Sequence, residues 1–290
     1  MFKFLGRSAR KKDPKKALRG VLGDYSLPSF SAVIMGALEE LRDPEATPAS
    51  VGNAISADPG LSVRLLATVN SAAYALRREV RSVEHAIALL GIPTVESLVL
   101  SAAVGDAMPS AAQPGYESDR FWRAAARRAA TARALAGILH PASASESFTV
   151  ALLQDMAVPF LATSLSDEYG PILTAWHSGG ESLADLEQEA FGWDHAEIGN
   201  WLGLEWKLPE SMAAAIGGHH GAVSDETGEL ESPPAVFLVS HIGETEENLG
   251  VDRLLEAAES EYGIDPDQIK PLIDESFQSA EELVESFIGS

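Results

Sequence analysis

The chain contains no cysteine among its 290 residues. This absence excludes disulfide bonds, zinc–thiolate sites, iron–sulfur clusters and cysteine nucleophiles. Any metal site must therefore use His, Asp or Glu side chains. A chain without cysteine also fits a reducing compartment, so we expect the protein to be cytoplasmic.

Long apolar runs are also missing. No segment approaches the roughly 20 uninterrupted apolar residues of a membrane-spanning helix, so we expect no transmembrane segment. The N-terminus lacks the apolar stretch of a secretory signal. The sequence patterns of a phosphate-binding P-loop, a G-x-S-x-G nucleophile elbow and an H-E-x-x-H zinc helix are absent as well.

Basic residues are scarce outside the first 20 positions. Residues 1–20 hold eight of the 21 Lys and Arg residues and a single acid, whereas the remainder holds 13 basic and 42 acidic residues, a net charge of −29. A body this acidic repels nucleic acid, so we expect no nucleic-acid partner. Residues 1–23 are predicted to be a basic flexible tail, which either contacts an anionic partner or folds against the acidic body.

Helical periodicity covers nearly the whole chain, and strand patterns are sparse. The predicted fold class is all-α, with an N-terminal lobe of about five helices at 24–110 and a larger helical lobe at 118–290. The Pro/Gly/Ser-rich stretch 109–119 separates them. In the second lobe we expect helices near 119–139, 145–164, 167–178, 182–190, 194–205, 209–219, 233–248, 251–260 and 266–288, the last broken or kinked near Pro271.

Three of the seven histidines belong to one stretch, "FGWDHAEIGNWLGLEWKLPESMAAAIGGHHG". His195 is predicted in the first turn of one helix, and His219 and His220 at the end of the next. An antiparallel helix pair would bring these ends together. Asp155 interrupts a predicted apolar helix and needs a partner if it is buried, which an imidazole of this group could supply.

Two interpretations of this group remain open at this point. It could form a metal or phosphate site built from three helices, or a hydrogen-bonded Asp–His network packed in the core. For His85, His140 and His177, in a short helix or at helix ends, we expect structural or surface roles.

Ordered motifs from about residue 24 to 265 resemble a known family. They are "LPSFSAVIMGALEELRDPEATPASVGNAISADPGLSVRLLATVNSAAY", "SVEHAIALLGIPTVESLVL", "ALLQDM" and "FGWDHAEIGNWLGLEWKLPE" followed by "GGHH". In this pattern the chain resembles the HDOD family, the HD-related output domains of bacterial signalling proteins. The resemblance implies an all-α fold whose second lobe is similar to the HD phosphohydrolases.

Catalytic HD relatives hold divalent metal with a His, an adjacent His-Asp pair and a distal Asp, and the HD-GYP phosphodiesterases add further histidines. When these ligand positions are transferred to this sequence, the first His corresponds to Ala124. The His-Asp pair corresponds to Gln154 and Asp155. The distal Asp falls at Gly243, with His241 and Glu244 as neighbours. The added histidines correspond to His195, His219 and His220. Alanine cannot bind metal and glutamine is a poor ligand, so we expect a vestigial site with no catalytic residue, no bound metal and no cofactor.

The resemblance therefore implies a non-catalytic regulatory or protein-interaction module. Its implied partners are bacterial signalling proteins such as diguanylate cyclases, histidine kinases or motility regulators. A local basic patch of Tyr74, Arg77, Arg78 and Arg81 is the candidate contact surface; alternatively, Asn70 and Ser71 pin adjacent helices and the arginines are only solvated. Other possible functions are a sensor that binds a cyclic dinucleotide or nucleotide, and a metal-dependent HD-type phosphohydrolase.

Overall fold

The computed structural model describes residues 19–22, 28–74, 76, 78–221, 230 and 232–288. Within these residues the protein is all-α, as predicted, and the nearest approach to a strand is an isolated bridge between Gln113 and Tyr116. No helix in this part of the chain combines the length and apolar character needed to cross a membrane. The predicted basic tail lies almost wholly outside the described residues, of which only 19–22 fall within it.

The N-terminal lobe contains the predicted five helices, and their starts follow local capping chemistry. Ser31, Asp58 and Ser82 each accept a hydrogen bond from a backbone amide of the first helical turn. Thr47 and Ser50 form a reciprocal capping box. The elements are α2 (Ala32–Leu41), α3 (Pro48–Ser56), α4 (Pro59–Asn70), the 3₁₀ turn η1 (Ala72–Tyr74), α5 (Val83–Leu90) and α6 (Ile92–Ala107).

The second lobe is built around one long alanine-rich helix, which packs against α8, α14 and α16. Small side chains on its buried face let these helices approach closely. The elements are α7 (Ser118–Leu139), η2 (Pro141–Ser143), α8 (Ala144–Leu153), α9 (Val158–Ser164), α10 (Ser166–His177), α11 (Leu183–Phe191), α12 (His195–Glu205), α13 (Glu210–Gly217), α14 (Pro234–Val239), η3 (Glu246–Asn248), α15 (Val251–Tyr262) and α16 (Pro266–Ile288).

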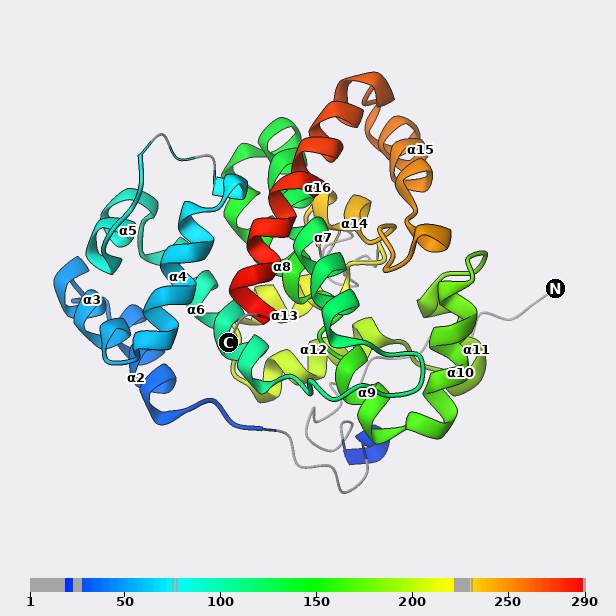
Figure 1. Cartoon of the computed structure of the whole chain (residues 1–290), viewed down its shortest axis with the longest axis horizontal. Coiled ribbons are helices and arrows are strands. Elements are labelled where there is room, and N and C mark those ends of the chain that lie inside the picture. Colours follow the sequence, from blue (N-terminus) through cyan, green and yellow to red (C-terminus); the bar gives the residue numbers. More distant parts are fainter. Residues whose placement is uncertain are drawn as a thin grey trace.

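The two lobes form one continuous core. Helices α2 to α6 lie together at one side of the molecule, and α16 runs alongside α7 toward them (Figure 1). Helix α6 packs on α8, while α16 contacts both α4 and η1. The C-terminal helix therefore joins the lobes instead of covering one of them.

The structure corrects three expected helices. The segment 145–164 is divided between α8 and α9, because Pro159 cannot donate a helical hydrogen bond to the carbonyl of Asp155 and would clash with it. The segment 233–248 is helical only to Val239, after which the chain folds back and the Gly243 amide donates to the carbonyl of Leu249 at 3.3 Å. Helix α16 is uninterrupted, with Pro271 inside it, so of the two predicted outcomes, a break or a kink, the break is wrong.

Candidate functional site

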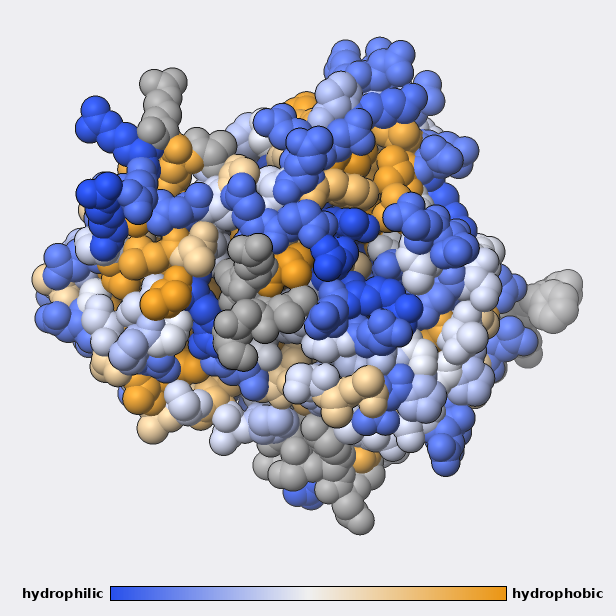
Figure 2. Space-filling view, viewed as in Figure 1, coloured by the Kyte–Doolittle hydropathy of each residue, from blue (hydrophilic) through white to orange (hydrophobic). Residues whose placement is uncertain are grey.

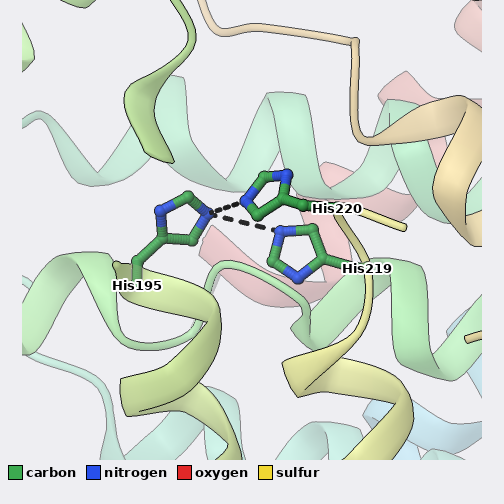
Figure 3. Close-up of side chains that lie close together, drawn as sticks. All are labelled: His195, His219 and His220. Carbon is green, nitrogen blue, oxygen red and sulfur yellow. Dashed lines mark hydrogen bonds between the residues drawn. The ribbon is translucent and has the colours of Figure 1, made fainter. Parts of the chain in front are cut away.

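The packing of α12 against α13 brings the three predicted histidines together. His195 begins α12, whose N-cap Asp194 accepts from the amide of Glu197, and the other two histidines follow α13. The Nε2 atom of His195 lies 3.3 Å from Nε2 of His219 and 3.1 Å from Nε2 of His220 (Figure 3). His195 and His219 are buried, and His220 is the most exposed of the three.

Asp155 joins this cluster from the turn between α8 and α9. Its Oδ1 atom lies 3.4 Å from Nε2 of both His195 and His219, so the carboxylate reaches the imidazoles as the sequence predicted. On its other side, Oδ2 lies 2.5 Å from the guanidinium Nη1 of Arg128, a residue of α7 that is 1% exposed. The guanidinium is anchored in turn by donation from Nε to the carbonyl of Ile242 at 2.8 Å.

The Arg128 guanidinium keeps the Asp155 side chain ionised. Burial alone would raise the pKa of Asp155, but the Arg128 guanidinium and hydrogen bonds from His195 and His219 hold that pKa well below its usual range. Asp155 is therefore a carboxylate with an internal counter-ion. Sequence reasoning missed Arg128, although it lies one helical turn after Ala124 and thus on the same face of α7.

A second carboxylate, Glu187 of α11, orients His195. Its Oε2 atom accepts from the His195 backbone amide at 2.8 Å and lies 2.6 Å from Nδ1 of the ring, and Tyr169 donates to its Oε1. Burial would lower the pKa of His195, but the charge of Glu187 and the hydrogen bonds that the ring donates to Asp155 and Glu187 raise it well above its ordinary value. Sequence reasoning also missed Glu187 and Tyr169, which the chain brings to the site from α11 and α10.

The other two imidazoles are held differently. Nδ1 of His219 lies 2.7 Å from the carbonyl of Ile216, which fixes its Nε2 toward the cluster. Desolvation of the ring and the neighbouring His219 and His195 lower the pKa of His220 well below its ordinary value, so it is neutral beside them. Within the described residues, these three histidines form the one group whose ligand atoms converge within 4.8 Å, as a metal site requires.

The remaining predicted positions supply no ligand. Ala124 is buried in α7, and the buried Gln154 side chain has an Oε1 atom without a hydrogen-bond partner in the described part of the protein. Gly243 has no room for a side chain, because a Cβ atom there would come within 2.1 Å of the carbonyl oxygen of Asn248. The residues present therefore do not fit the metal centre of the catalytic HD relatives.

The neighbouring Glu244 does not replace the distal ligand. The Glu244 side chain is 2% exposed and binds elsewhere, with Oε2 3.1 Å from Nε2 of His177 and 3.4 Å from Nε of Arg120. Burial and the nearby Arg253 lower the pKa of His241.

Comparison with known sequences identifies the family to which this arrangement of helices belongs. The sequence profile of the HDOD domain matches residues 27–222, which is more than half of the chain. The chain belongs to the HDOD domain family. A protein of Treponema pallidum (strain Nichols), named as uncharacterized, is 23% identical to this HDOD chain over 202 residues. Those residues are 67% of this chain and 37% of the relative, so the chain spans little more than a third of its length.

Solved structures share the HDOD fold. A protein from Shewanella amazonensis SB2B, named as a candidate phosphohydrolase, has a TM-score of 0.69 at 22% identity and covers 92% of this chain and 98% of its own. An HDOD domain protein from Geobacter sulfurreducens has a TM-score of 0.69 at 20% identity, covering 94% and 96%. A candidate signal transduction protein from Marinobacter aquaeolei VT8 has a TM-score of 0.66 at 18% identity, covering 95% and 66%.

The predicted surface patch is only partly at the surface. Tyr74 is buried at 5% exposure, packs edge-on against Phe148 and lies under the guanidinium of Arg133, so its assignment to an exposed patch is wrong. Arg78 and Arg81 are exposed, and Arg81 pairs with Glu79 at 2.8 Å. Arg77 lies outside the described residues.

The pinning role proposed for Asn70 is confirmed. Its amide donates to the carbonyls of Leu66 and Val80 and accepts from the Val80 amide, at 2.9, 2.8 and 2.7 Å. The Ser71 hydroxyl donates to the carbonyl of Thr68 at 2.7 Å. The side chain of Asn70 thus connects the end of α4 to the segment that precedes α5.

Proposed function

We propose that this HDOD chain is a non-catalytic regulatory and protein-interaction module of signal transduction. The observation that supports this most directly is the ion pair between Arg128 and Asp155. In the catalytic HD relatives the aspartate in this position serves a metal, whereas here a guanidinium neutralises it.

Metal catalysis of phosphate-ester hydrolysis needs ligands fixed around an open coordination position for water. Ala124, Gln154 and Gly243 offer no strong ligand, and Asp155 has its charge satisfied by Arg128. A metal ion beside Asp155 would also face the repulsion of the Arg128 cation, which the surrounding low-dielectric core screens poorly.

A metal-dependent phosphohydrolase is the competing function, and one observation favours it. His195, His219 and His220 present converging nitrogen atoms that could bind a single transition-metal ion. Such an ion would displace the contacts among the three rings.

Elemental analysis and an activity assay distinguish these functions. Protein purified after growth with added Fe, Mn or Zn is measured for bound metal and for hydrolysis of cyclic di-GMP and bis(p-nitrophenyl) phosphate. We expect less than about 0.1 metal ion per chain and turnover equal to that of Asp155→Ala. Stoichiometric metal with turnover that Asp155→Ala abolishes would overturn the proposal, and binding of cyclic di-GMP without turnover would indicate a sensor.

The partner surface is tested separately. We propose that the exposed Arg78 and Arg81 contribute to contacts with an acidic surface of a signalling protein, such as a diguanylate cyclase, a histidine kinase or a motility regulator. Affinity purification from the native cell, with mass spectrometry, identifies the partner. Arg78→Glu with Arg81→Glu should weaken capture at least tenfold if the patch binds, because reversed charge repels the same surface. Capture unchanged by this double variant would remove the patch from the interface.

A further inference from the structure

A cavity of about 650 Å³ lies where the two lobes meet, away from the histidine cluster. Its walls come from η1 of the N-terminal lobe, from α7 and the start of α8, and from α16. One wall is made of small residues on one side of α7, at Ala130, Ala134 and Gly137. A Cβ atom added to Gly137 would meet nothing within 4 Å, so the space above this wall is open. This volume is in the range of sites that bind small molecules.

One wall of the cavity carries a cation. The guanidinium of Arg133 lies 4.1 Å from the centre of the Tyr74 ring, and its Nη1 atom is 3.4 Å from the hydroxyl of Ser145. Among the described residues it has no carboxylate partner. The guanidinium makes a cation–π contact with Tyr74 and one hydrogen bond to Ser145, and its other N–H donors can bind a planar anion such as a carboxylate.

The α16 wall carries carboxylates. Glu282 accepts from the amide of Ala72 at 2.9 Å, which joins α16 to η1. Glu275 also lines the cavity and, within the described part of the chain, makes no hydrogen bond or ion pair. Neither carboxylate reaches Arg133, so opposite charges face the same space without contact.

We propose that this cavity binds a small zwitterion of the α-amino acid class. The ligand carboxylate pairs with Arg133, and the ligand ammonium pairs with Glu275 and the free oxygen of Glu282. A purely anionic ligand such as a cyclic dinucleotide would be repelled by the two glutamates, and a purely cationic one by the arginine. A zwitterion places a negative charge beside Arg133 and a positive charge beside the two glutamates.

This site goes beyond the proposed interaction function, because it would let the chain bind a small molecule directly. The ligand would contact η1 and α16 at once, and these elements belong to different lobes. Binding would therefore stabilise the contact between the lobes.

The test screens the full chain against the 20 amino acids by thermal shift, each at about 10 mM, followed by calorimetry. We expect at least one to raise the melting temperature. For that ligand, the matched amine lacking the carboxylate and the matched acid lacking the ammonium should each bind about tenfold more weakly or worse. No amino acid binding at this concentration, or equal binding of either truncated analogue, would overturn the proposal.

Variants locate the binding. Gly137→Phe fills the open space and should abolish binding, while Arg133→Gln and Glu275→Gln should each weaken it about tenfold. Asp274→Asn is the matched control, because Asp274 is the exposed neighbour of Glu275 on α16 and does not line the cavity. If Arg133→Gln fails to fold, the comparison of Glu275→Gln with Asp274→Asn still decides. Binding unchanged in Gly137→Phe would place the ligand elsewhere.

Discussion

Arg128 supplies the positive charge that Asp155 requires inside the protein. An unpaired buried carboxylate is strongly unfavourable, and removing one partner of a buried ion pair typically costs about 3–5 kcal/mol. We therefore expect Arg128→Met to lower the free energy of unfolding by about that amount in denaturant titrations. The variant should also gain affinity for Zn²⁺, because Asp155 and the three imidazoles are then free of a competing cation.

Arg127→Met is the matched control for this change. Arg127 is the preceding residue of α7, but it is partly exposed: its guanidinium pairs with Glu281 at 3.7 Å and lies 5.1 Å from the centre of the Phe277 ring. A surface pair of this kind contributes about 1 kcal/mol or less. Equal destabilisation of the two variants would show that the Arg128–Asp155 pair is not a special feature of the core.

The lowered pKa of His220 sets the sign of this residue's own contribution to the pH dependence of stability. Its pKa is lowered in the folded protein, so the unfolded chain binds more protons at pH values between that lowered pKa and about 6.5. This contribution to stability is present above that pH and is lost as the pH falls toward the lowered pKa. We expect His220→Asn to lose less stability than the natural chain between about pH 7 and pH 5 in denaturant titrations. Parallel pH profiles would contradict the assignment.

At the scale of elements, the Asn70 side chain fixes the connection between α4 and α5 by hydrogen bonds to Val80. Asn70→Ala removes three hydrogen bonds at the end of α4, two of them to Val80. We expect a loss of about 1–3 kcal/mol in the free energy of unfolding, because the buried amide and carbonyl of Val80 lose their partner. Asn53→Ala, on the exposed face of α3, should change it by less than about 0.5 kcal/mol.

Local chemistry predicted the elements well where helices have caps and amphipathic faces. Ser82 before α5 and the antiparallel pair that carries His195 and His219 are examples, and both follow from residues close in sequence. The division at Asp155 was missed, although Pro159 lies four residues later. The apolar pattern runs through both α8 and α9, so it predicted one continuous helix in spite of Pro159.

The approach of Asp155 to the imidazoles was predicted, but the other contacts between distant segments could not be predicted from one sequence. Arg128 and Asp155 meet only because α7 packs against α8, and Glu187 reaches His195 through a turn between helices. The burial of Tyr74 likewise depends on Phe148 and Arg133 from the second lobe. Such pairs carry no periodic pattern, so composition and spacing could identify the histidines but not the residues that set their charge.

At the scale of the whole molecule, the acidic charge dominates. The chain carries 43 acidic and 21 basic residues. Hydrophilic side chains cover much of the α15–α16 edge in Figure 2, where many of the acids lie. Mutual repulsion of these charges destabilises the compact state and is screened by salt.

We therefore expect the melting temperature to rise as NaCl increases from about 10 to 150 mM, where the screening length falls to about 8 Å. Scanning calorimetry measures this directly. A rise confined to concentrations near about 1 M would instead indicate general exclusion of salt from the protein surface, and it would contradict a role for charge repulsion.

The ion pair at Asp155 has a final consequence for the living cell. Its cation is part of the polypeptide and is made whenever the chain is translated, whereas an enzyme with a bound metal depends on what the cell imports. Chelators, iron starvation or replacement by a competing ion therefore have nothing to remove from this pair. We therefore expect the stability of this HDOD chain to be independent of metal supply, and its melting temperature to be unchanged by EDTA.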